Sequence, residues 1–429
     1  MSTICSPQKV NIDRLLGRKS APATKADTDA LADALARQTQ QIKDLEGKVT
    51  RPSEYVGGLP EAVDQKLRAA YQEGRILQLE GYQAQNAHKH QEAIERFTRA
   101  LPLAETDSQR AALYNLRGNS YDSISEYGRA EADYQETLKL AQRMSPAEDA
   151  AGARAAALGG LGLIYANRGE LDKAEEHHNQ ALAIHRDIGS RLGEAADLAN
   201  LGVVYGRRGT LDNAEKCLRQ ALEIQREIGN RLGEANELGS LGIVHGQRRA
   251  LDQAEGCFKQ ALEIDRGIGN RLGQANQLGN LGNVYRLRGG PGDLDRAEER
   301  FKQGLGVFRE IGNRRGQATA LGNLGTVYGQ RGGPGDLDKA EEQFKLALRI
   351  QREIGDHLGE AASLGNLGAA YLKRGGLEKA RDHLQQAQTI YKEIGAGGEG
   401  PEKVRRALER IAEQQRQQER GEGESHPEG

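Results

Sequence analysis

An internal repeat of 40 residues is the feature that most constrains this chain. The segments LGLIYANRGELDKAEEHHNQALAIHRDIG, LGVVYGRRGTLDNAEKCLRQALEIQREIG and LGIVHGQRRALDQAEGCFKQALEIDRGIG begin at Leu161, Leu201 and Leu241. Later copies begin at Leu281, Leu324 and Leu367, where the step grows to 43 because GGPGD is inserted at 289–293 and 332–336. Two degenerate copies lie upstream, around Gly81 and Gly118. Eight copies of one short unit predict a stack of equivalent units instead of a single central core.

Each unit carries the signals of two helices. Each unit opens with Leu-Gly, and an aromatic residue follows three positions after the glycine. An alanine comes nine positions after the aromatic residue. A large residue follows four positions after this alanine, and a second alanine three positions after the large residue. In one copy these are Leu241, Gly242, His245, Ala254, Phe258 and Ala261. A glycine that follows the last apolar residue predicts a C-terminal cap at Gly189, Gly229, Gly269, Gly312 and Gly355. Thr210, Asp293 and Asp336 stand where the second helix needs an N-cap.

This order of small and large residues resembles the tetratricopeptide repeat. The 40-residue length, the EIGNRLGEA link and the Asn before Leu-Gly are most similar to the repeats of kinesin light chains and of the Leu-Gly-Asn repeat proteins. The resemblance implies an all-α, right-handed superhelical solenoid of about eight helix-turn-helix units with a C-terminal capping helix. It also implies a concave groove that binds peptide segments of partner proteins.

The segments outside the repeats differ in composition. Leu31, Leu35, Ile42, Leu45 and Val49 follow a 4-3 spacing, which is typical of a short coiled coil or of a helix that folds back on the array. Val404, Leu408 and Ile411 share one face of a late helix and suit a cap on the apolar end of the array. We therefore expect a flexible arm at 1–26, a short helix at 27–56, the repeat array at 57–396, the capping helix at 397–420 and a disordered tail at 421–429.

Composition excludes several classes of function. The 60 basic and 62 acidic residues nearly balance, so no bulk field favours nucleic acid. No apolar run approaches the roughly 20 residues that span a bilayer, and the first residues lack the apolar region of a signal peptide. Cys5, Cys217 and Cys257 lie far apart, which predicts free thiols in a reducing compartment. The sequence predicts a cytoplasmic protein that is not an integral membrane protein.

Two glycine columns interrupt the first helix of the units. Gly162, Gly202, Gly242, Gly282, Gly325 and Gly368 are expected where the two helices of a unit cross, with the tyrosine three residues on packing over the gap. The second column lies three residues earlier, at Gly159, Gly239, Gly279, Gly322 and Gly365 with Ala199 in register. On the tetratricopeptide template it faces the groove as a floor without side chains.

The candidate binding residues flank that floor. Asn200, Ser240, Asn280, Asn323 and Asn366 stand beside the second column, with Asn283 one turn on in a single copy. Their amides could clamp the backbone of a bound peptide, or could hold neighbouring helices and set the superhelical twist. The groove wall varies further along, at Asn167, Arg207, Gln247, Leu287, Gln330 and Lys373, with Arg286 adjacent. Such variation suits either a non-repetitive partner with acidic residues or a solvated helix face.

No catalytic arrangement stands out. His177, His178 and His185 fall in one second helix, but no carboxylate or thiolate stands three or four residues away on the same face, so the sequence predicts no metal site. The GGPGD loops lack the Lys-Ser/Thr pair of a phosphate-binding loop. We expect no cofactor and no enzyme activity.

The sequence thus favours a non-catalytic adaptor that binds a peptide or helix of another protein, as a monomer or as a weak dimer through the N-terminal helix. One alternative, implied by resemblance alone, is a bacterial kinesin-light-chain-like accessory protein of a tubulin-like cytoskeletal filament. Another is a regulatory phosphatase of a signalling protein, for which residues 27–75 are short.

Overall fold

A computed structural model describes residues 61–86, 89–145 and 147–423 of the chain. Within those ranges all regular structure is helical. The predicted arm at 1–26, the predicted helix at 27–56 and the end of the tail, 424–429, lie outside the described residues. The helices are α3 (Glu61–Asn86), α4 (His90–Ala100), η1 (Leu101–Leu103), α5 (Asp107–Ser123), α6 (Tyr127–Ala141), α7 (Ala147–Arg168), α8 (Leu171–Asp187), α9 (Arg191–Arg208), α10 (Leu211–Glu227), α11 (Arg231–Gln247), α12 (Leu251–Gly267), α13 (Arg271–Arg288), α14 (Asp293–Glu310), α15 (Arg314–Arg331), α16 (Asp336–Glu353), α17 (His357–Lys373), α18 (Leu377–Glu393) and α19 (Glu399–Gly423).

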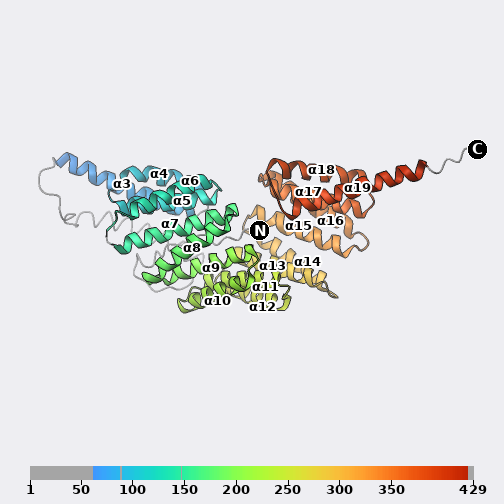
Figure 1. Ribbon diagram of the computed structural model, residues 1–429, viewed down its shortest axis with the longest axis horizontal. Helices are drawn as coiled ribbons and strands as arrows, with labels where there is room; N and C mark the ends of the chain where they lie inside the picture. Colours follow the sequence, from blue (N-terminus) through green and yellow to red (C-terminus); the bar gives the residue numbers. More distant parts are fainter. Residues whose placement is uncertain (1–60, 87–88, 146, 424–429) are drawn as a thin grey trace, which may run out of the picture. The chain divides into compact units, whose positions relative to one another are not determined.

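The chain divides into two compact units, with the boundary between Val244 and His245 inside α11. In the first unit, α3 packs with α4, α5 with α6, α7 with α8 and α9 with α10, and each pair packs on the next. In the second unit the same order runs from α12 to α19. Figure 1 shows this succession of neighbouring helices within each unit. The expected all-α repeat architecture is confirmed.

The ends of the second helices follow the predicted glycines. Gly189, Gly229, Gly269, Gly312 and Gly355 all have φ between +67° and +69°, the left-handed conformation that glycine adopts at little cost. Each preceding isoleucine closes the last turn, as Ile188 does by donating its backbone N–H to Ile184 O at 3.0 Å. The C-cap prediction is therefore confirmed.

The N-cap prediction is wrong in its details. The N-cap positions of α14 and α16 are Gly292 and Gly335, and Asp293 and Asp336 are the first residues of those helices. Their carboxylates accept from the backbone N–H groups of Gly290 and Gly333, each at 3.1 Å, because the inserted residues form a tight turn that the aspartate closes. Thr210 is the N-cap residue of α10, but its hydroxyl donates back to Tyr205 O at 3.2 Å and caps no N–H.

The first glycine column lies where the two helices of one repeat cross, as predicted. A Cβ placed on Gly202, Gly282 or Gly325 would lie 2.6 to 2.7 Å from an atom of Leu218, Phe301 or Phe344 on the second helix. The side chain that fills the gap therefore comes from the second helix. The predicted role of the tyrosine is wrong, because Tyr285 instead donates to Glu255 Oε1 of the preceding repeat at 2.8 Å.

That tyrosine belongs to a set of hydrogen bonds that links each of these repeats to the next. Glu255 also accepts from Arg288 at 2.7 Å, and the set Tyr328, Glu298 and Arg331 repeats the arrangement at 2.8 and 2.6 Å. Burial alone would raise the pKa of Glu255, but hydrogen bonds from Lys259, Arg288 and Tyr285 lower it to about 2. The link therefore holds an ionised carboxylate between neighbouring repeats.

The last helix, α19, covers the end of the second unit. Val404 and Ile411 are 4% and 1% exposed and join the same apolar cluster as Leu384 and Tyr391 of α18. Among the described helices, none is both long and apolar enough to cross a membrane.

Candidate functional site

Two glycines of the second column have no packing neighbour. A Cβ added to Gly279 of α13 or to Gly322 of α15 would meet no atom within 4 Å. Each lies inside a helix, where glycine destabilises by roughly 0.5 to 1 kcal/mol relative to alanine. At the ends of the column the surroundings differ, since Gly159 faces Asp197 and Gly365 faces Val404. The backbone of α13 and α15 is thus open at positions where packing does not demand glycine.

The asparagine column, defined as Asn200, Asn280, Asn323 and Asn366, runs beside these glycines. The first three side chains are half-buried and Asn366 is exposed. Asn280 Nδ2 donates to Gln277 Oε1 at 3.4 Å within its own helix, a long hydrogen bond. For the other three, the described part of the chain offers no hydrogen bond. These amides therefore retain donors and acceptors for a ligand.

One observation bears on the alternative, structural role of the column. Gly160 stands 40 residues before Asn200, at the matching place on α7. A Cβ there would lie 2.4 Å from Cζ of Tyr134, a fully buried residue of the preceding repeat. This edge of a first helix can thus face a neighbouring repeat, so the clamp and the stacking roles both stay open.

Arg286 lies two turns beyond Gly279 on α13. Its Nη2 donates to Asn283 Oδ1 at 3.4 Å, while Nε is buried without a hydrogen-bond partner. Burial lowers the pKa of this guanidinium. A partly desolvated arginine with an unused donor is suited to a carboxylate or carbonyl of a ligand.

Most of the remaining predicted wall residues are exposed, whereas Asn167 is half-buried and its Nδ2 donates to Asp122 Oδ1 of the preceding repeat at 3.5 Å. Arg207 Nη1 donates to Ala166 O of α7 at 2.6 Å, and Lys373 Nζ donates to Gly329 O of α15 at 2.7 Å. These two cations occupy equivalent positions, and each ties its helix to the first helix of the preceding repeat. Gln247 and Gln330 are exposed, and in the described part of the chain neither donates a hydrogen bond to the preceding repeat.

Comparisons with known proteins agree with this architecture. The tetratricopeptide repeat family model matches residues 153–227, 194–267 and 335–393. Residues 153–267 and 335–393 of this chain are tetratricopeptide repeats. No curated protein matches the sequence significantly. The tetratricopeptide repeat thus accounts for the paired helices of the matched segments.

Solved structures of other proteins match this chain at low sequence identity. A Rap protein complexed with competence and sporulation factor is 15% identical, with a TM-score of 0.52, and the match covers 81% of this chain and 99% of that one. A signal transduction ATPase with a tetratricopeptide repeat sensor from Pyrococcus horikoshii is 16% identical, with a TM-score of 0.52 and coverages of 75% and 52%. BtubC (BKLC) from P. vanneervenii is 18% identical, with coverages of 59% and 94% and a TM-score of 0.42.

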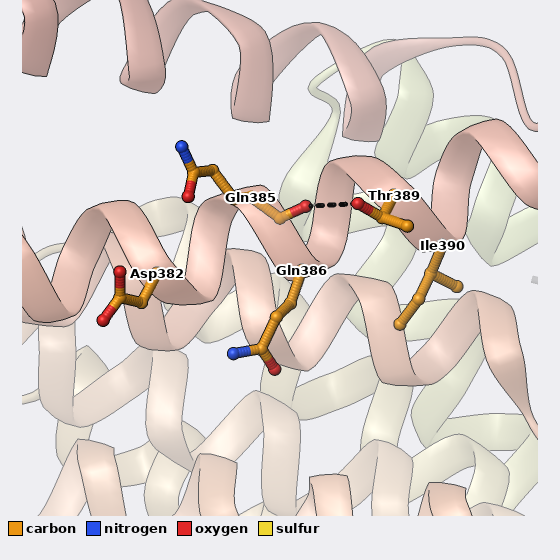
Figure 2. Close-up of a pocket in the computed structure, with 5 residues that line it drawn as sticks. All are labelled: Asp382, Gln385, Gln386, Thr389 and Ile390. Atoms are coloured by element: carbon orange, nitrogen blue, oxygen red, sulfur yellow. Dashed lines mark hydrogen bonds between the residues drawn. The ribbon is translucent and has the colours of Figure 1, made fainter.

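Open depressions on the described surface include two that lie on second helices of repeats. One is lined by Asp382, Gln385, Gln386, Thr389 and Ile390, all from α18, and Figure 2 shows Thr389 donating to Gln385 O, at 3.0 Å. The other lies on α4. Neither contains a predicted site residue.

Sequence reasoning missed a buried cluster of His178, His185 and Asp197. It sought a carboxylate within four residues on the same helix, whereas Asp197 comes from α9 and both histidines from α8. For His178 the available signal was a polar residue at a position that is apolar in other repeats, such as Phe258, Phe301 and Leu384. The positions of His185 and Asp197 are polar in several other repeats and carried no such signal. In the described ranges no group of His, Cys, Asp and Glu has the arrangement of a metal site. Within the described residues Cys217 and Cys257 form no disulfide, and burial raises the pKa of the Cys217 thiol.

Proposed function

We propose that this tetratricopeptide repeat protein is a non-catalytic adaptor that binds an extended or helical segment of a partner protein. In the second unit the binding face consists of Gly279, Asn280 and Arg286 of α13, Gly322 and Asn323 of α15, and Asn366 of α17. The first unit carries a candidate face of its own on α9, at Asn200 and Arg207.

The observation that carries the proposal is the open space at Gly279 and Gly322. A helix gains stability from alanine at such a place, so two interior glycines without a packing neighbour suit a backbone that a ligand approaches closely. The adjacent amides can bond the ligand main chain through donors and acceptors. The unused donor of Arg286 favours a segment with an acidic residue.

The test is the double variant Gly279→Ala, Gly322→Ala. We expect it to be more stable than the wild type by about 0.5 to 1 kcal/mol per site, because the added methyl groups meet no atom. Partners captured by the wild-type chain from a lysate, identified by mass spectrometry, should be lost. Retention of every partner would remove the support for this face.

A matched control is Gly282→Ala, one turn along α13. Its added Cβ would lie 2.7 Å from Phe301, so overpacking should destabilise the second unit by about 1 to 3 kcal/mol in urea unfolding. Stabilisation by alanine at Gly279 and destabilisation by alanine at Gly282 would show that the first glycine lies at an open surface and the second at a packed helix crossing.

The asparagine column calls for its own variant, with Asn200, Asn280, Asn323 and Asn366 all changed to alanine. If the column is a clamp, a partner disappears while the melting temperature holds. A fall in melting temperature would assign the column to stacking, and unchanged partners would direct the search to residues 1–56 and the inserted loops.

The two alternative functions stay predictions. Co-sedimentation with a tubulin-like filament would detect a filament accessory role, and a phosphatase assay on a phosphorylated signalling protein would detect the other. Dimerisation through residues 27–56 also stays a prediction, because that segment lies outside the described residues.

A further inference from the structure

The first described helix, α3, exposes two large apolar side chains on one face. Ile76 is 47% exposed and Leu79 is 40% exposed, and residues three positions apart lie side by side on a helix. The face of α3 that packs on α4 is complete, because Gly81 is the crossing glycine of this repeat and Phe97 fills the gap. Packing within the repeat therefore leaves Ile76 and Leu79 uncovered.

The residues that match Ile76 in the later repeats are buried. Ile76 lies five residues before the crossing glycine Gly81. The residues at the same place in α5, α7, α9, α11, α13, α15 and α17 are 0% to 6% exposed, and they are Leu113, Ala157, Asp197, Glu237, Gln277, Ala320 and Ser363. Burial is thus the rule at this place, even for side chains that are far less apolar than isoleucine.

The neighbour that covers this place in a later repeat is the second helix of the preceding repeat. Asp197 of α9 accepts a hydrogen bond from His185 of α8 at 2.6 Å. Leu79 faces the same way, since the residue at its place in α7, Gly160, lies against Tyr134 of α6. A helix packed on α3 from the preceding position would therefore cover both of its exposed residues.

The order of the chain determines which segment can take that position. For α5, α7, α9, α13, α15 and α17, the covering helix directly precedes the covered helix in sequence. For α3 the preceding segment is 27–56, which carries an apolar seam with 4-3 spacing at Leu31, Leu35, Ile42, Leu45 and Val49. The seam is similar in length to a second helix such as α8, which has 17 residues.

The linker between this segment and α3 is long enough for the arrangement. Along α3, Ile76 lies roughly 22 Å from the first residue, Glu61. Residues 51–60 can span at most about 35 Å, so they can return the segment alongside the first turns of α3. The last repeat is covered in a comparable way, because Val404 and Ile411 of α19 are buried in its apolar cluster.

We propose that residues 27–56 cap the first repeat by packing their apolar seam on Ile76 and Leu79 of α3, in the position that a second helix takes before each later repeat. This contact removes both the seam and the exposed face of α3 from water. The seam is then used within one chain, and its apolar residues are not available to join two copies. The cap does not depend on the proposed binding face.

Photo-cross-linking of the full-length chain identifies the occupant. With p-benzoyl-phenylalanine in place of Ile76, irradiation should join position 76 to residues 27–56. In a mixture of isotope-labelled and unlabelled protein, cross-linked peptides share one label if the segment comes from the same chain. Pairs of mixed label would show that it comes from a second copy and would overturn the cap, as would capture of no peptide from 27–56. The same group in place of Leu358 of α17, which is 58% exposed, is the control and should not capture that segment.

Amide hydrogen exchange of residues 73–86 measures whether the contact stabilises α3. We expect Ile42→Ser with Leu45→Ser to lower protection there by about tenfold or more, because the burial of large apolar side chains is lost. Ile76→Ser should act in the same way, whereas Leu358→Ser should leave α3 unchanged. Unchanged protection of α3 in either of the first two variants would overturn the cap. The variant of the seam alters no residue of the described repeats, so the test stands even if Ile76→Ser unfolds the first repeat.

Discussion

Glu237 of α11 shows how a single residue can set the pH dependence of stability. Its side chain is 2% exposed and Oε2 has no hydrogen-bond partner. Burial raises its pKa to about 8 from an ordinary value of 4.5. Between these values the folded state holds a proton that the unfolded chain has released, so stability decreases as the pH rises from 4.5 to 8.

We therefore expect Glu237→Gln to stabilise the protein by about 1 to 3 kcal/mol at pH 8 and to have little effect near pH 4.5. Gln277 occupies the same place one repeat later and is buried, so the substitution fits the fold. Urea unfolding at both pH values provides the measurement. An equal effect at pH 4.5 and pH 8 would show that Glu237 does not titrate in this range.

Sequence reasoning succeeded or failed at single residues according to where their partners lie. The role of Gly282 could be predicted, because its crossing position repeats in every unit. The partners of Tyr285 and His178 could not, since Glu255 and Asp197 come from other helices and their approach depends on the stacking of repeats. A search confined to one helical face cannot find such pairs.

At the scale of elements, the links between successive repeats predict acid sensitivity. The folded-state pKa of Glu255 is about 2, below its ordinary value of 4.5. The stabilisation is present above pH 4.5 and is lost as the pH falls towards 2. Glu255→Gln should cost about 0.5 to 1 kcal/mol at pH 7, since solvent screens this partly exposed network, and should cost nothing at pH 2.

A matched control for that link is Asp252→Asn. Asp252 bonds the same Arg288 at 2.7 Å, but its side chain is 97% exposed. Thermal unfolding from pH 7 to pH 2 should show a smaller loss for Asp252→Asn than for Glu255→Gln. Equal losses would mean that the hydrogen bonds of Glu255 add nothing beyond its charge.

The end of a helix could be predicted where it depends only on the residues at that end. A glycine in the left-handed conformation needs no partner, so the C-caps followed from the sequence. The N-caps of α14 and α16 depend on how the inserted Gly-Pro-Gly turn folds, which moved Asp293 and Asp336 into the first turn of their helices. The identity of a bound segment depends on a molecule that the sequence does not contain.

At the scale of the whole molecule, stability is divided among neighbouring interfaces. Ile411 of α19 is 1% exposed in the core of the second unit. We expect Ile411→Ala to lower protection against hydrogen exchange in α17 to α19 by about 2 to 5 kcal/mol of local opening free energy. The first unit should be unchanged, and Arg410→Ala at an exposed position should serve as the neutral control.

The nearest-neighbour order of contacts has a mechanical consequence. Within the second unit each described helix packs mainly on the helices before and after it in sequence. A pulling force on the two ends of that unit would therefore pass through its interfaces in series, and no shear-bearing contact between distant segments would share the load. Unfolding would begin at the weakest terminal interface and advance one helix pair at a time. The chain would therefore lengthen in steps under constant tension. When the tension is released, refolding would start from the repeats that remain folded.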